Sequence, residues 1–267
     1  MEYIYYTSHG KDSMAGLHVA LDILGWPVDR VVHSVVWATC DIQGTLPKMV
    51  EFKKHAEAEI KRRWGLTVET LLAKHNFEEL FYRYQNQSKA GVDGTIRGWP
   101  LLKGSWCARD LKQFTYVPKA SETHYIGIAI DEPDRFRQLS DRKKSPLVEA
   151  GWTEAMCYDW CKENDLLAPT YETSMRDGCW FCPKQGLDQL RLLYHTRPDL
   201  WALMLKWDKD SPVTFKAGSV DRKTGEKIPG KTVHDYDRRF QAEDAGDIPK
   251  DRRFRWKMLD NDKEVTT

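Results

Sequence analysis

Long hydrophobic runs are missing from this sequence of 267 residues. No apolar stretch approaches the roughly 18 residues that a membrane-spanning helix needs. The first residues, Met1–Tyr6, also lack the basic start and apolar core of a secretory signal. We therefore expect a cytoplasmic protein with no membrane partner, in a compartment where thiols stay reduced. The six cysteines then suggest a metal, a cluster or buried thiols before they suggest disulfides.

An excess of charge of one sign is missing as well, because 41 basic residues face 40 acidic ones. No overall positive field therefore indicates a nucleic-acid-binding protein, although a local patch stays open. The densest basic runs, Lys61–Arg63 and Arg252–Arg255, are typical of solvated helix faces. The hydrophobic fraction of 41% is enough for a sizeable core.

Strand and helix patterns alternate in the first half of the chain. The segments Ile4–Thr7, Val31–Ala38 and Tyr125–Ile130 are rich in β-forming residues and predict strands. Apolar residues recur at helical spacing from Ser13 to Leu24, and Pro47–Trp64 begins with the proline typical of a first helical turn. This alternation predicts an α/β fold built on a parallel sheet.

The pattern changes after about Asp141. Helices are predicted at Thr153–Lys162, Leu187–Leu193 and Pro198–Trp207. The tail from Asp208 has weak periodicity, which predicts loops and short elements. We therefore divide the chain into an α/β domain at residues 1–140 and a smaller helical, cysteine-containing part at residues 141–267, packed on the first.

A polar loop, Ser8–Ser13, joins the first predicted strand to the first predicted helix. Such a loop lies at the carboxyl edge of the sheet, where its amides and the helix N-terminus form an anion site. Gly10 allows a phosphate to approach the backbone closely, and Lys11 adds positive charge. Asp12 would repel phosphate directly, so we expect it to hold the loop or a magnesium ion. The Walker A and Gly-x-Gly-x-x-Gly patterns are both absent, and a polar turn that only caps the helix is the alternative.

The stretch Thr7–Ser13 resembles the Ser-Gly-Gly-x-Asp-Ser pyrophosphate loop of the adenine nucleotide alpha hydrolases, with His9 in place of a glycine. That superfamily includes the N-type ATP pyrophosphatases and the phosphoadenosine phosphosulfate (PAPS) reductases. Three later stretches resemble the PAPS reductase branch in the same order, and they are Asp41–Pro47, Gly127–Arg135 and Ser145–Thr153.

This resemblance implies a Rossmann-like parallel sheet with helices on both faces, and an adenine nucleotide, ATP or PAPS, as ligand with Mg²⁺. It implies catalytic roles for Lys11, Asp12 and Ser13. The residues expected to bind the nucleotide are Ser8, His9, Gly10, Lys11, Asp12, Ser13, Asp41, Gly127 and Arg135.

Cys179 and Cys182 form a Cys-x-x-Cys knuckle, a spacing at which two thiolates bind one metal. A site with four thiolates needs two more ligands, and PAPS-reductase-like proteins have a similar series of cysteines. Our choice for the two is Cys107 and Cys161, with Cys157 and then His195 as alternatives. These ligand types fit zinc or a 4Fe–4S cluster, and the spacing does not choose between them. Buried thiols without a metal are the structural alternative.

No cysteine follows Cys182, so the C-terminal thiol through which true PAPS reductases act is missing. The leading hypothesis is therefore an enzyme that cleaves ATP to AMP and pyrophosphate and adenylates an acceptor. Nucleic acid is one candidate acceptor, and a sulfur-donor protein is a candidate partner. The alternatives are a sulfonucleotide reductase or sulfotransferase-like enzyme, and a nucleotide sensor without turnover. A homodimer also stays open.

Overall fold

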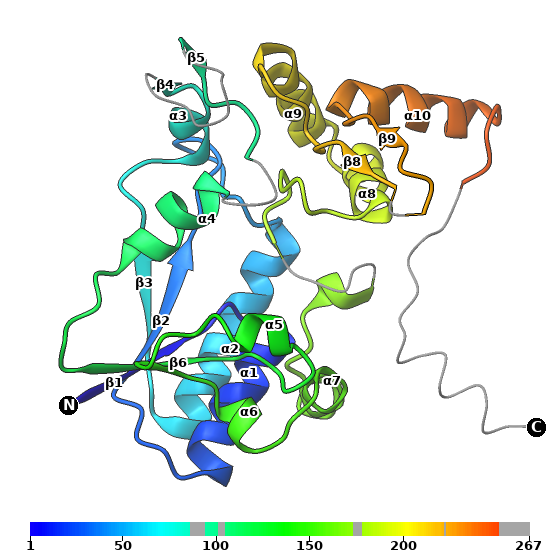
Figure 1. The fold of residues 1–267 in the computed structure, drawn as a ribbon. Helices are drawn as coiled ribbons and strands as arrows, with labels where there is room; N and C mark the ends of the chain where they lie inside the picture. Colours follow the sequence, from blue (N-terminus) through cyan, green and yellow to red (C-terminus); the bar gives the residue numbers. More distant parts are fainter. Residues whose placement is uncertain (86–93, 101–104, 173–177, 222, 251–267) are drawn as a thin grey trace, which may run out of the picture.

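A parallel sheet of five strands forms the centre of the protein in a computed structural model (Figure 1). The structure describes residues 1–85, 94–100, 105–172, 178–221 and 223–250. The strand order is β3-β2-β1-β6-β7, and every neighbouring pair in this sheet is parallel. The strands are β1 (Glu2–Tyr6), β2 (Arg30–Val35), β3 (Val68–Leu72), β6 (Glu122–Ile126) and β7 (Lys143–Lys144). The predicted Rossmann-like α/β fold is thereby confirmed.

One face of the sheet packs against a layer of helices, and a shorter helical segment lies on the other face. The helices are α1 (Lys11–His18), α2 (Pro47–Trp64), α6 (Pro146–Glu149) and α7 (Glu154–Glu163). Alternation along the strands points Tyr5, Val31 and Tyr125 into the core of this layer. On the other face, Ser34 bonds Thr115 of η2 (Gln113–Thr115) at 2.8 Å between the two hydroxyl oxygens. This η2 segment follows α4 (Trp106–Leu111).

Local signals account for the helix ends. Helix α2 has the predicted bounds, with Pro47 at its first turn and Gly65 at a left-handed φ of 70° after its end. Helix α7 begins after Thr153, whose hydroxyl accepts a hydrogen bond from the Met156 amide at 3.3 Å. The predicted helix from Ser13 to Leu24 forms in two pieces, because α1 continues as the π-helical turn η1 (Val19–Ile23).

A second core is aromatic and lies between the carboxyl end of β2 and the C-terminal helices. It contains Phe77, Trp99 and Trp207, all at most 1% exposed. The indole N–H groups of Trp99 and Trp207 donate to Asp208 and Glu78, each at 2.9 Å. The helices around this core are α3 (Phe77–Phe81), α8 (Leu187–Thr196), α9 (Pro198–Asp210) and α10 (Val233–Ala245). Much of the tryptophan content therefore serves packing.

Helix α10 corrects the prediction that the tail from Asp208 holds only loops and short elements. Its ends have clear signals, because Thr232 caps the N-terminus and Gly246 adopts a φ of 82° at the C-terminus. Its apolar residues are few, so its helical periodicity is weak. The helix is stabilised by packing: Val233 and Phe240 are buried, and Arg191 of α8 pairs with Glu243 at 2.6 Å.

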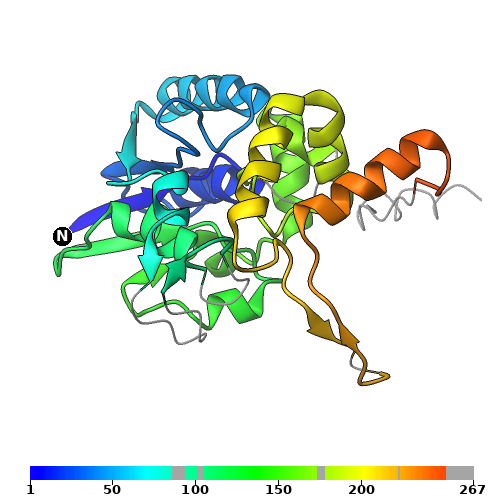
Figure 2. The same cartoon turned by 90° about the horizontal axis from the view of Figure 1, so that it is seen from above.

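The boundary that we placed at residues 140 and 141 falls inside the sheet layer. Strand β7 pairs with β6, and α6 and α7 pack on α1 beyond that point. The shorter elements include β4 (Tyr84–Gln85), β5 (Thr95–Ile96), α5 (Pro133–Phe136), η3 (Pro169–Glu172), β8 (Ser219–Val220) and β9 (Lys227–Ile228). Figure 2 shows that the hairpin of β8 and β9 projects from the body.

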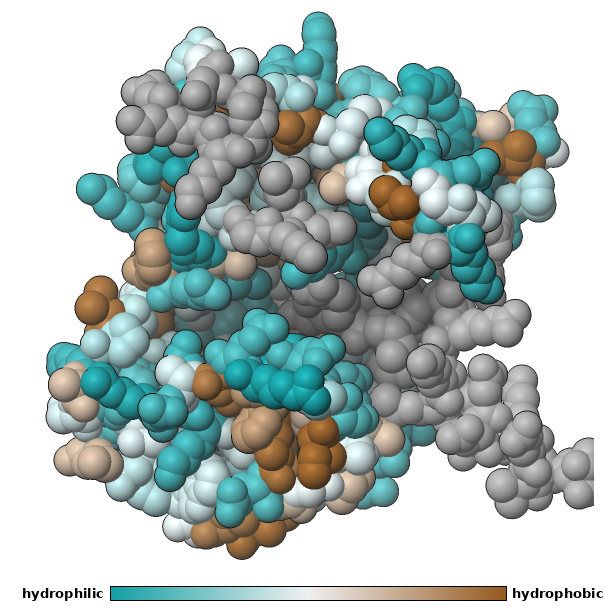
Figure 3. All heavy atoms as spheres, viewed as in Figure 1, coloured by the Kyte–Doolittle hydropathy of each residue, from teal (hydrophilic) through white to brown (hydrophobic). Residues whose placement is uncertain are grey.

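Hydrophobic residues on the face in Figure 3 form separate patches among hydrophilic ones. Within the described part of the chain, no helix has both the length and the apolar character to cross a membrane.

Candidate phosphate-binding loop

The predicted loop leaves β1 at its carboxyl end and leads into α1. The amide of Thr7 still bonds the Val32 carbonyl of β2 at 2.9 Å, so the loop begins directly at the sheet edge. His9 then takes a left-handed φ of 61°. Glycine adopts this conformation most easily, although histidine is among the residues that tolerate it. The pyrophosphate-loop pattern has glycine at the position of His9, and the backbone conformation there is one that favours glycine.

The amide groups of the loop meet hydroxyl oxygens. The Ser8 amide donates to Ser13 Oγ at 3.1 Å, and the His9 amide donates to Thr7 Oγ1 at 3.1 Å. The Gly10 amide donates to Ser8 Oγ at 3.4 Å. The Lys11 amide donates to the hydroxyl of Tyr171 at 3.1 Å. Four successive N–H groups, from Ser8 to the first residue of α1, are therefore bonded to hydroxyl oxygens, an arrangement that suits an anion in their place.

Gly127 lies against the first turn of α1. A Cβ atom on Gly127 would stand 2.4 Å from the carbonyl oxygen of Asp12, so only glycine permits this approach of β6 to the loop. The structure thus brings Gly127 to the loop as a packing residue. The hydroxyl of Tyr5 bonds the Ser13 carbonyl at 2.7 Å and holds the same turn from the sheet side.

Lys11 is almost fully buried, with 1% of its surface exposed. Its ammonium group lies 2.6 Å from an Asp12 oxygen and 3.1 Å from a Glu154 oxygen. Burial opposes its charge, but the carboxylates of Asp12 and Glu154 outweigh burial and raise the pKa of Lys11. Burial also raises the pKa of Asp12, although Lys11 acts in the opposite direction. The carboxylates of Asp12 and Glu154 therefore neutralise the positive charge of Lys11. Much less of that charge is left to attract a phosphate.

Further acidic groups stand beside this pair. Glu132 interacts with Asp12 electrostatically, and Asp131 accepts the first amide of α7, from Glu154, at 3.0 Å. Arg135 is bonded to Glu132 at 2.5 and 2.6 Å, and its side chain is 56% exposed. The structure therefore places Arg135 at the same sheet edge, with its guanidinium group held by a carboxylate.

The ring of His9 points into a buried polar cluster that the sequence did not reveal. Its Nε2 atom lies 3.2 Å from Glu57 Oε1, and its ring meets His33 edge to face at 4.5 Å. His33 Nδ1 donates to the Thr7 carbonyl at 2.9 Å, and His33 Nε2 accepts from Lys53 at 3.2 Å. Burial, aided by His9 and Lys53, lowers the pKa of His33 to about 2, so His33 is neutral. In the sequence, the signal for this cluster was His33, a histidine within an otherwise apolar predicted strand.

Asp41 lies in the turn that follows β2, at the same edge of the sheet. It is exposed, and the hydroxyl of Thr39 donates to it at 2.6 Å. This hydrogen bond lowers the pKa of Asp41. The turn continues to Gly44, where a Cβ atom would stand 3.2 Å from the sulfur of Cys179. The Asp41 turn therefore connects the sheet edge to the cysteine knuckle.

Three of the four predicted metal ligands come to one region. The knuckle is a tight turn in which the Cys182 amide bonds the Cys179 carbonyl at 3.0 Å. The neighbouring Trp180 amide fastens the turn to the Gly44 carbonyl at 2.9 Å. Cys107, on α4, lies close enough to Cys182 for the two thiols to interact. Burial is the largest cause of a raised pKa of Cys107, and its sulfur lies 2.9 Å from Ser105 Oγ.

Cys161 corrects the predicted four-cysteine set, because the structure places it elsewhere. Its thiol donates to the Lys11 carbonyl at 3.4 Å inside the α1–α7 interface, and burial raises its pKa to about 12. Cys157, the first alternative, lies one helical turn earlier in the same buried cluster. His195 pairs with Asp244 at 3.4 Å. Over the described residues, no three His, Cys, Asp or Glu side chains are grouped as metal ligands.

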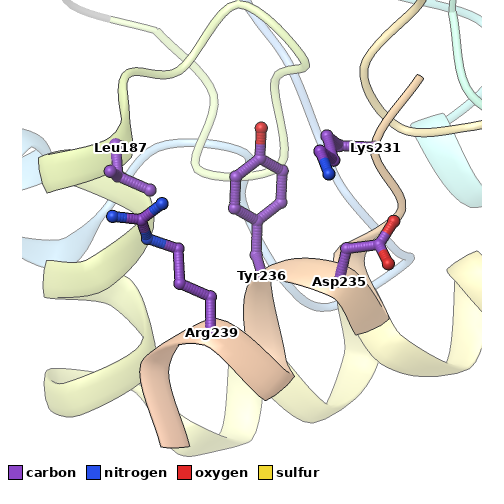
Figure 4. A pocket seen from close by; sticks show the side chains of 5 residues that line it. All are labelled: Leu187, Lys231, Asp235, Tyr236 and Arg239. Carbon is purple, nitrogen blue, oxygen red and sulfur yellow. The ribbon is translucent and has the colours of Figure 1, made fainter. Parts of the chain in front are cut away.

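A cavity of about 390 Å³ opens between α8 and α10, and none of the predicted site residues lines it (Figure 4). Its lining is Leu187, Lys231, Asp235, Tyr236 and Arg239. The cavity contains no loop residue and no cysteine, so it carries no part of the predicted chemistry. No protein-family model matches the chain, and no curated protein matches it either.

Proposed function

We propose that this protein binds an adenine nucleotide through Ser8–Ser13 and cleaves ATP to AMP and pyrophosphate, leaving AMP on an acceptor. The observation that carries the proposal is the row of four amides at the carboxyl edge of β1, each bonded to a hydroxyl. The resemblance of Thr7–Ser13 to a pyrophosphate loop supports the same assignment.

In the proposed reaction, an acceptor oxygen attacks the α-phosphorus, and the bond to the bridging oxygen of pyrophosphate breaks. The loop amides would stabilise the negative charge on the leaving pyrophosphate, which is positioning and electrostatic catalysis. Asp12 offers a carboxylate oxygen of the type that Mg²⁺ prefers, and bound Mg²⁺ would neutralise phosphate charge. Lys11 would then hold Asp12 in place through their ion pair.

The cysteines as placed do not form a complete metal site. Structural zinc and 4Fe–4S sites take four ligands, and among the described residues Cys107, Cys179 and Cys182 are not grouped as three ligands. Zinc or a 4Fe–4S cluster there, with a fourth ligand other than Cys161, belongs to the proposal and takes no step in the reaction. Nucleic acid and a sulfur-donor protein stay the proposed acceptor and partner.

One observation favours a nucleotide sensor as the second candidate. Asp12 and Glu154 offset the charge of Lys11, which lowers the electrostatic stabilisation that this residue can give to a transition state. The sulfonucleotide reductase reading is less favoured, because it needs a reactive thiolate. Burial raises the pKa of Cys107, which disfavours that state.

Calorimetry with MgATP, PAPS and pyrophosphate tests the proposal, followed by an assay for pyrophosphate released from ATP. The test variant is Ser13→Ala, which removes the hydroxyl bonded to the Ser8 amide. The matched control is Ser219→Ala on the exposed hairpin. We expect the same Kd for MgATP in the wild type and the control, and a changed Kd in Ser13→Ala. ATP binding without turnover would favour the sensor, a preference for PAPS would favour the sulfonucleotide enzyme, and binding of none would refute the loop assignment.

A further inference from the structure

Tyr171 reaches the candidate loop from a distant part of the chain. It lies on η3, 160 positions after Lys11, and its side chain is buried. Its hydroxyl accepts the Lys11 amide at 3.1 Å, and it would stand 3.0 Å from a Cβ atom on Gly10. The phenol oxygen therefore sits directly against the first turn of α1, where an anion is expected.

The ring of Tyr171 is held by a small cluster of its own. This cluster contains Met49 of α2 and Ala168, both 1% exposed, and η3 packs against α2. The hydroxyl is thus delivered to the loop by a packed element rather than by a freely rotating side chain. The position of the oxygen is consequently well defined.

The other three hydroxyls on the loop amides are local. They belong to Thr7, Ser8 and Ser13, and each can turn away by rotation about a single side-chain bond. The Lys11 amide differs, because its acceptor comes from η3. A phosphate oxygen takes over this amide only when the phenol oxygen has moved off it, and because the ring is packed, that exchange requires a shift of η3 against the loop.

We propose that Tyr171 is a placeholder for the nucleotide: its hydroxyl occupies the position of a phosphoryl oxygen on the Lys11 amide until a nucleotide displaces it. This inference rests on the proposed function of the loop. The charged phosphate oxygen is the stronger acceptor, so exchange favours the ligand. The hydrogen bond given up with Tyr171 lowers the net affinity. Tyr171 therefore raises the Kd for the nucleotide.

Tyr171→Phe is the direct test, because it removes the hydroxyl and keeps the ring that packs on Met49. Calorimetry would compare the Kd for MgATP and for pyrophosphate between the wild type and this variant. A net hydrogen bond of about 0.5–1.5 kcal/mol corresponds to a Kd that is roughly 2- to 12-fold lower in Tyr171→Phe. The matched control is Tyr194→Phe, on α8 in the aromatic core, for which we expect an unchanged Kd.

Hydrogen exchange of the Lys11 amide gives a readout that needs no nucleotide. We expect faster exchange in Tyr171→Phe than in the wild type, and renewed protection in both proteins at saturating pyrophosphate. Tighter binding by the variant supports the placeholder, also when only the variant binds measurably. Equal or weaker binding by the variant, with binding by the wild type intact, overturns the placeholder and leaves the proposed function standing. Absence of binding in both proteins overturns both.

Discussion

The two cores of this protein differ in what they bury beside their apolar residues. The core under the sheet buries Lys11, His9 and His33 close to the loop. The aromatic core around Trp207 also buries charges, but these are paired within the core: Arg191 with Glu243 at 2.6 Å, and Asp208 with the indole N–H of Trp99 at 2.9 Å. A buried charge is costly to maintain and is a common feature of functional sites, whereas paired indoles are common in packing. Under the proposed function, the buried groups of the sheet core lie beside the nucleotide loop, whereas the paired groups of the aromatic core join α8, α9 and α10.

The largest effect is expected in the aromatic core. Trp207→Ala would remove a side chain with no exposed surface, stacked on Trp180 at 5.7 Å between ring centroids. We expect the free energy of unfolding to fall by about 3–5 kcal/mol, measured by urea denaturation. Phe114→Ala is the control, since Phe114 is 68% exposed and its loss should change little. A small loss at Trp207 would contradict the structural role of this core.

Removal of the buried cation should cost less and should be reversible by a second change. Lys11→Met leaves the carboxylates of Asp12 and Glu154 without their shared partner. We expect a loss of about 2 kcal/mol in the free energy of unfolding, below the range for fully buried pairs because both carboxylates are partly exposed. Asp12→Asn in the same protein should restore part of the loss. Additive losses in the double variant would show that the two groups do not interact.

The neutral His33 predicts a dependence on pH. Its pKa is about 2 in the folded protein against 6.5 for an ordinary histidine. Well above pH 6.5, His33 is neutral in the folded and the unfolded protein. The free energy of unfolding then does not depend on its protonation. As the pH falls below 6.5, only the unfolded state takes up the proton, and stability drops by up to about 1.4 kcal/mol per pH unit. Urea denaturation at pH 7.5, 6.5 and 5.5 should show this slope. His33→Gln should make it shallower, with a remaining contribution from His124, whose pKa is also lowered by burial. An equal slope in that variant would assign the pH dependence to other groups.

The smallest effect is expected at the cap of α7. Thr153→Ala removes the hydroxyl that accepts the Met156 amide. We expect a loss of about 1 kcal/mol in the free energy of unfolding, the usual value for such a cap. Thr153→Ser, which keeps the hydroxyl, is the matched control and should stay close to the wild type. A loss in Thr153→Ser as large as that in Thr153→Ala would point to the methyl group instead of the cap.

Local signals in the sequence were sufficient for part of the fold. The bounds of α2 followed from Pro47 and Gly65, and the start of α7 followed from Thr153, because caps act within one turn. The place of the loop between the first strand and the first helix followed from the change of periodicity. Helix α10 was missed because its sequence has no regular apolar stripe. Its buried apolar residues, Val233 and Phe240, are covered by other helices.

The sequence alone therefore determined the α/β class, the position of Ser8–Ser13 and the spacing of the knuckle. These depend on neighbours along the chain, whose periodicity and turn chemistry can be read directly. The tertiary structure decided which distant groups meet: Tyr171 at the Lys11 amide, His33 beside His9, and Cys161 at α1 instead of the knuckle. Such contacts depend on how helices pack against the sheet, and no local pattern records which side chains that packing brings within bonding distance.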